Sequence, residues 1–75
     1  MKSVRIEPGN ERGIFLIDVV CDCGQNGLTN EATGERSFKH EVRAGCGEQD
    51  TVLSCSECGK KYRVHPQGTH IHVGE

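Results

Sequence analysis

The chain has 75 residues, a formal net charge of −2, 33% hydrophobic residues, one Tyr and no Trp. This length allows one domain, spanning residues 1–75. So small an apolar content rarely stabilises a domain of this size without an additional cross-link such as disulfides or a bound metal ion. Ten glycines argue against a helical bundle. No apolar run has transmembrane length, and the first residues lack the apolar segment of a signal peptide. We therefore expect a cytoplasmic protein without a membrane partner, monomeric by default.

The apolar pattern is typical of strands rather than helices. Residues 14–20 form a β-branched and aromatic run that leads into the first cysteines, and residues 51–53 lead into a later cysteine pair. Residues 37–43 alternate strictly between two sets of side chains. Because successive side chains of a strand point to opposite faces, this alternation predicts one face made of Phe38, His40 and Val42.

A hairpin is predicted near the C-terminus. Residues 61–64 and 69–73 read as strands, and they flank His65-Pro66-Gln67-Gly68. Pro followed two residues later by Gly is typical of a tight turn, so we expect His65 in that turn. Residues 1–13 and 74–75 are the segments expected to be less ordered.

Five cysteines are the candidates for such a cross-link. An odd number cannot pair completely as disulfides within one chain, and structural disulfides are rare in a reducing cytoplasm. Four of them form two short pairs, each followed by Gly where a predicted strand ends. Such a glycine can adopt positive φ without steric cost, and the backbone amides of the resulting knuckle can point at the sulfurs. We expect one tetrahedral ion bound by Cys21, Cys23, Cys55 and Cys58.

The second pair carries a family resemblance. Cys-x-x-Cys-Gly followed by Lys60-Lys61-Tyr62 resembles the knuckle of zinc ribbons and rubredoxins, whereas the first pair, Cys-x-Cys-Gly, is one residue shorter. The resemblance covers residues 14–28 and 50–73 and implies a small, mostly β, metal-stabilised fold, an antiparallel zinc β-ribbon. The 31 residues between Cys23 and Cys55 must add strands of their own, which predicts an extra hairpin between the knuckles. The implied cofactor is one Zn²⁺ per chain, with iron as the alternative because four thiolates suit both metals.

The sequence does not decide the roles of Cys46 and of the histidines near the C-terminus. Cys46 is either a free thiol in a loop, a replacement for one member of the first knuckle, or part of a second metal site with His40, His70 or His72. His70-x-His72 puts both imidazoles on one face of a strand, a spacing that can bind metal. The alternative is an ordinary polar face on a terminal strand.

The expected function is binding rather than catalysis. Four thiolates close the shell of a metal ion and leave no position for a reactive water, so we expect no enzyme. Zinc ribbons serve as docking pieces in transcription, translation and replication proteins, and the resemblance therefore implies an adaptor that binds a protein partner. Residues 7–57 are strongly acidic, which disfavours tight nonspecific binding to phosphates.

Two alternatives remain. A nucleic-acid contact would use Lys60, Lys61 and Arg63, with Tyr62 for base stacking, although Tyr62 also suits packing behind the metal. A thiol redox protein would use Cys46 or the Cys55/Cys58 pair, because Cys-x-x-Cys also occurs in thiol oxidoreductases. The segment after Cys58 reads as a strand, not as the helix that such enzymes need.

Overall fold

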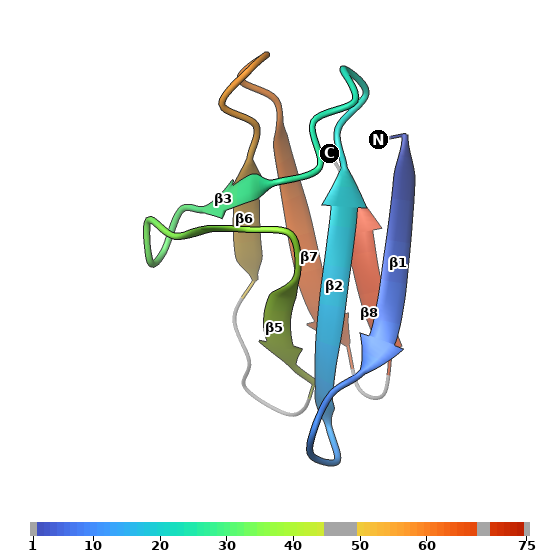
Figure 1. The fold of residues 1–75 in the computed structure, drawn as a ribbon. Helices are drawn as coiled ribbons and strands as arrows, with labels where there is room; N and C mark the ends of the chain where they lie inside the picture. Colours follow the sequence, from blue (N-terminus) through green and yellow to red (C-terminus); the bar gives the residue numbers. More distant parts are fainter. Residues whose placement is uncertain (1, 45–49, 68–69, 75) are drawn as a thin grey trace.

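The computed structural model describes residues 2–44, 50–67 and 70–74 of the chain, the side chain of Gln67 excepted. Within these ranges the chain forms strands and no helix (Figure 1). In chain order they are β1 (Ser3–Pro8), β2 (Ile14–Val20), β3 (Leu28–Asn30), β4 (Arg36–Ser37), β5 (His40–Arg43), β6 (Thr51–Ser54), β7 (Lys61–Gln67) and β8 (His70–Gly74). In the part of the chain covered by the structure, no helix could cross a membrane.

The strands form two antiparallel sheets that lie one in front of the other (Figure 1). One sheet has the order β1-β2-β5 and the other β4-β3-β6-β7-β8. The hairpin β3–β4 lies in the sequence between the two cysteine pairs. The small all-β fold with an extra hairpin between the knuckles is therefore confirmed.

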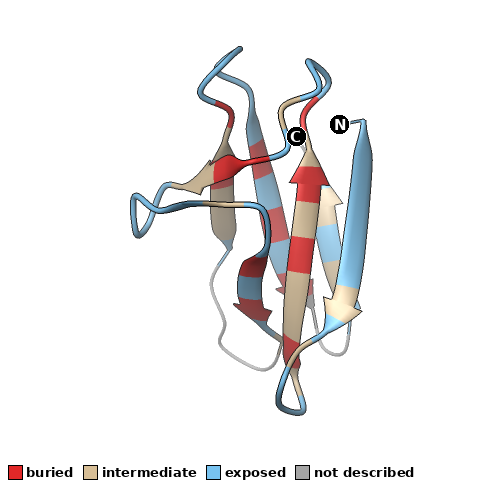
Figure 2. Ribbon diagram, viewed as in Figure 1, coloured by how far each residue is buried: buried red, intermediate tan, exposed pale blue. Residues whose placement is uncertain are grey.

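The core lies between the two sheets and follows the two-residue period of their strands. On β7 the buried residues Tyr62, Val64 and Pro66 alternate with exposed ones, as the banding in Figure 2 shows. On β2 the buried residues Ile17 and Val19 are followed by buried Cys21 at the same spacing. The inward face of β2 therefore carries its cysteine directly to the end of the core.

The strand predicted at 37–43 is interrupted, and the expectation for Phe38 was wrong. β4 ends at Ser37 and β5 begins at His40, and Phe38 is 63% exposed. The Ser37 hydroxyl donates a hydrogen bond to the Lys39 carbonyl and accepts one from the Lys39 amide, which makes a local turn. This turn directs Phe38 outward, and the predicted alternation holds only from His40, which is buried, onward.

The hairpin β7–β8 is present, but its first strand is longer than the sequence predicts. The expected turn position of His65 was wrong, because His65 and Pro66 lie within β7 and pair with His72 and Ile71. Pro66 has no N–H for a second partner strand, and the pairing of β6 with β7 ends at Val64. Proline is therefore tolerated here. Residues 68–69 lie outside the described part of the chain.

The first strand was not anticipated from the sequence. β1 pairs with β2 over its whole length, within the segment expected to be less ordered. Val4 and Ile6 lie opposite the core residues Val19 and Ile17 but are 41% and 42% exposed. Only Val4 and Ile6 are large apolar residues in this strand, and this short alternation in the sequence gives little indication of a strand.

Candidate metal centre

The first knuckle is a tight turn directly after β2. The Cys21 amide donates to the Gln25 carbonyl at 2.9 Å, and the Gly24 amide donates to the Cys21 carbonyl at 2.8 Å. Gly24 has a φ of +96°, which residues with a Cβ rarely adopt. The chain can therefore reverse immediately after Cys23, so that both sulfurs face the same side.

The second knuckle repeats this design with one more residue. The Cys55 amide donates to the Lys60 carbonyl and the Gly59 amide to the Cys55 carbonyl, both at 2.9 Å. Gly59 has a φ of +78°. The shorter Cys-x-Cys spacing of the first knuckle thus shortens the loop by one residue and preserves its closing hydrogen bonds.

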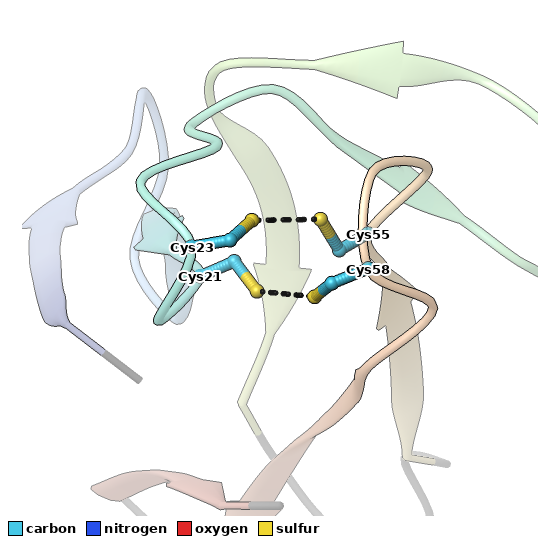
Figure 3. A group of neighbouring side chains, drawn as sticks. All are labelled: Cys21, Cys23, Cys55 and Cys58. Atoms are coloured by element: carbon cyan, nitrogen blue, oxygen red, sulfur yellow. Dashed lines mark hydrogen bonds between the residues drawn. The ribbon is translucent and has the colours of Figure 1, made fainter.

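The two knuckles face each other at one end of the sandwich, and their sulfurs converge (Figure 3). All four sulfurs lie within 4.8 Å of one another, with Cys21 Sγ 3.2 Å from Cys58 Sγ and Cys23 Sγ 3.6 Å from Cys55 Sγ. A tetrahedron of sulfurs about 2.3 Å from a zinc ion has edges of about 3.8 Å. The distances are far longer than the roughly 2.05 Å of a disulfide, and all four cysteines are free. The cluster therefore fits a four-coordinate ion.

Each knuckle contributes one buried and one exposed cysteine. Cys21 and Cys55 are 0% and 2% exposed, whereas Cys23 and Cys58 face solvent. This difference follows from the strands, because the first cysteine of each pair continues the inward face of β2 or β6 and the second lies in the turn. The centre is thus anchored in the core on one side and open to an incoming ion on the other.

The sulfurs differ in how readily they lose a proton. The Tyr62 hydroxyl, together with the backbone N–H of Cys23, lowers the pKa of Cys21 to about 6. The backbone N–H of Lys60 favours the thiolate of Cys58, but the neighbouring Cys21 sulfur and burial outweigh it and raise the pKa of Cys58 to about 12. Four thiolates this close together need a positive ion to compensate their charge, and metal binding releases their protons.

Tyr62 packs behind the cluster. Its side chain is fully buried, and its hydroxyl lies 3.2 Å from Cys21 Sγ and also accepts a hydrogen bond from the Asp22 amide. Burial raises the pKa of Tyr62 to about 12, so the hydroxyl remains a donor to the sulfur. A side chain without exposed surface cannot stack on a base, and the structure therefore favours the packing role.

An ion pair joins the two knuckles. Asp22 lies between the cysteines of the first knuckle, and its carboxylate accepts a hydrogen bond from the Lys60 ammonium group at the end of the second. This hydrogen bond lowers the pKa of Asp22 to about 2. Sequence reasoning missed the pairing, although the position of an acid inside one knuckle and a base after the other was a usable signal.

The other cations of the predicted basic patch are also paired with acids. Lys61 Nζ lies 3.0 Å from Glu31 Oε1, and Arg63 Nε lies 3.2 Å from Asp50 Oδ2. With Lys60 bound to Asp22, all three cations have a carboxylate partner. The structure therefore does not display them as an uncompensated basic surface.

The candidate histidines do not join the cluster. His70 and His72 lie on β8, and among the residues that the structure covers the four cysteines form the only group of three or more metal-ligating side chains within reach of one ion. Cys46 lies outside the described residues. His40 is buried on β5 and does not belong to the group of metal-ligating side chains found among the described residues.

Comparison with known proteins adds no family assignment. No family model matches the chain, and neither the curated proteins nor the solved structures include a match. Fold and site together define a small all-β protein with a four-cysteine cluster that is compatible with a metal ion.

Proposed function

We propose that the chain is a small zinc-binding module in which the ion has a structural role, and that the module acts as an adaptor for a protein partner. The observation that carries the first part is the convergence of four free sulfurs from two knuckles within 4.8 Å. These sulfurs come from segments more than thirty residues apart, so an ion bound to them ties the two sheets together.

Zinc suits this donor set because it accepts four thiolates in a tetrahedral shell and is redox-inert. Iron is the alternative occupant of such a site. When bound, zinc supplies positive charge and a cross-link. Cys21, Cys23, Cys55 and Cys58 would fill its shell and leave no position for a reactive water, which argues for a binding role rather than catalysis. Reduced thiols also agree with a reducing compartment such as the cytoplasm.

The energy scale supports a structural role. Binding of zinc to a four-ligand site contributes about 10–16 kcal/mol of apparent free energy near neutral pH. A core as small as this one rarely supplies more than about 3–5 kcal/mol. Within the part of the chain that the structure describes, few large side chains are fully buried, and two of the core residues, Cys21 and Cys55, would be ligands themselves. The ion would therefore decide whether the chain folds.

Elemental analysis of the purified protein tests the metal. We expect one zinc per chain, and loss of that zinc in Cys55→Ser and Cys58→Ser. Iron in the same ratio would identify the metal as iron and would still support a four-cysteine metal site. A metal-free protein with a reversible disulfide would reject the proposal in favour of thiol redox chemistry.

The adaptor role is supported by the exposed apolar side chains. Phe38 is 63% exposed at the turn between β4 and β5, and Val4 and Ile6 are also partly exposed on β1. Aromatic side chains are enriched at protein interfaces, where they supply large contact areas. The candidate cations are paired with acids, so a protein partner is better supported than a nucleic acid. By its resemblance to zinc ribbons, the module would dock on transcription or translation machinery.

Affinity capture with the metal-loaded protein tests the partner. We expect a specific protein to be retained by the wild type after nuclease treatment and lost with Phe38→Ser. Arg12→Ser, which changes an exposed residue elsewhere, should retain it. Capture that disappears on nuclease treatment would point instead to nucleic acid, and capture unaffected by Phe38→Ser would remove Phe38 from the contact.

A further inference from the structure

Two histidines that are seven positions apart in the sequence lie directly opposite each other on neighbouring strands. In the antiparallel register of β7 and β8, His65 pairs with His72. Directly opposite residues share one face of the sheet, with Cβ atoms about 4.5–5.5 Å apart. Both residues are exposed and line the same surface hollow as Asp50 and Arg63.

This pair differs from the His70-x-His72 pair that the sequence suggests. His70 and His72 lie two residues apart on one strand, which separates them by about 6.6–6.8 Å along the strand. His65 is therefore the closer partner of His72, and His70 lies opposite Gln67 instead. The register of the hairpin, which places His65 within β7, creates a pair that the sequence alone does not reveal.

Asp50 fixes the orientation of one imidazole. One of its carboxylate oxygens hydrogen-bonds with His65 Nδ1, and the other lies 3.2 Å from Arg63 Nε. A carboxylate bound to one ring nitrogen of a histidine fixes the tautomer and leaves the other nitrogen, Nε2, as a ligand. The same carboxylate neutralises the guanidinium, which would otherwise repel a cation.

We propose that His65 and His72 form a second, surface metal site that binds a divalent transition-metal ion through two imidazoles, with Asp50 as the group that orients His65. Imidazole suits nickel, copper and zinc, and water completes the coordination of an ion held by two side chains. The site is independent of the cysteine cluster, because His65 and His72 lie within β7 and β8 and Asp50 directly precedes β6, whereas the knuckles lie at one end of the sandwich (Figure 1). His65 is four residues beyond the start of β7, about 13 Å along the strand.

Titration with Ni²⁺, followed in ¹H–¹⁵N spectra of the protein as purified, tests the site. A paramagnetic ion at this position broadens the amide signals of β7 and β8 around residues 65 and 72 and leaves those of the two knuckles sharp. Absence of broadening, or broadening confined to the knuckles, would overturn the proposal. Broadening confined to the knuckles would show that Ni²⁺ binds at the cysteine cluster. The zinc proposal for that cluster would still be tested separately, by elemental analysis.

Three histidine variants identify the ligands. His65→Asn and His72→Asn should each weaken Ni²⁺ binding at least tenfold, whereas the matched control His70→Asn should change the affinity by less than about twofold. All three residues are exposed, so spectral dispersion should be unchanged. Loss of binding in His70→Asn with retention in His65→Asn would assign the ion to the pair on β8 and overturn the cross-strand site.

Asp50→Asn separates orientation from ligation. Loss of a carboxylate behind a ligating histidine typically costs about 10–100-fold in metal affinity. We expect a weakening in that range, together with a change in the ¹⁵N shifts of the His65 ring that reports its tautomer, while His72 remains a ligand. An unchanged affinity would remove Asp50 from the site.

Discussion

The hydroxyl of Tyr62 donates a hydrogen bond to the sulfur of Cys21 at 3.2 Å, across a separation of 41 residues in the sequence. Tyr62 is fully buried, so this contact links the centre of the core to the cysteine cluster. The same hydroxyl accepts a hydrogen bond from the Asp22 amide. The Tyr62 side chain on β7 therefore holds the first knuckle at two points.

Replacement of this hydroxyl tests its contribution. Tyr62→Phe keeps the ring and removes both hydrogen bonds, and a lost hydrogen bond to a charged group costs about 1.5–3 kcal/mol. We expect a loss of that size in the free energy of unfolding, measured by denaturant titration at a fixed metal concentration. A stability equal to that of the wild type would mean that Tyr62 acts through its ring alone.

Metal removal should unfold the domain. The four clustered cysteines lie in knuckles that follow strands of both sheets, and a core of this size would not compensate for the loss of an ion bound to them. We expect a strong chelator to abolish the β circular-dichroism spectrum and the amide dispersion, and Cys55→Ser or Cys58→Ser to do the same. Cys46→Ser is the matched control, because it leaves the four clustered sulfurs intact. Retained dispersion after complete metal removal would contradict the prediction.

The two glycines that close the knuckles should resist substitution. Gly24 and Gly59 have positive φ, and no atom of the described residues lies within 4 Å of an added Cβ, so the cost of alanine comes from the backbone alone. That cost is about 1–2 kcal/mol per residue. We expect Gly24→Ala and Gly59→Ala to lower the free energy of unfolding by this amount. Gly74→Ala, which has equal space at an ordinary φ, should leave it nearly unchanged.

Acidification should destabilise the fold through His40. Burial lowers the pKa of His40, against the opposing effect of the Leu28 and Ser37 carbonyls and of Asp18. Among the described residues, its Nε2 atom has no hydrogen-bond partner. The unfolded chain therefore binds the proton more readily than the folded one, near its ordinary pKa of about 6.5. The stability contributed by neutral His40 is complete above that pH and decreases as the pH falls toward the lower folded pKa.

The comparison of wild type with His40→Gln isolates this effect from protonation of the cysteines. With the metal saturating in both proteins, unfolding free energies measured between about pH 7.5 and 5.5 should decline more steeply for the wild type. Parallel pH profiles would show that the buried imidazole does not contribute to the acid sensitivity of the fold.

Several structural features could be predicted from short stretches of sequence. The runs before Cys21 and Cys55 form β2 and β6, and the glycines after Cys23 and Cys58 have the positive φ that the knuckles require. These features depend on neighbouring residues only. The turn at Phe38 was not predicted, because a side-chain hydrogen bond at Ser37 overrides the local pattern. β1 was not predicted because its two apolar side chains remain half exposed and the strand depends on pairing with β2.

The sequence by itself determined the strand-rich fold and the two knuckles, because periodicity and turn chemistry are local properties of the chain. Only the tertiary structure decided that Cys21 faces Cys58, that Tyr62 lies behind them and that His65 lies opposite His72. The physical reason is that the register of the strands and the packing of the two sheets bring these side chains together, and both depend on the whole core rather than on any one segment.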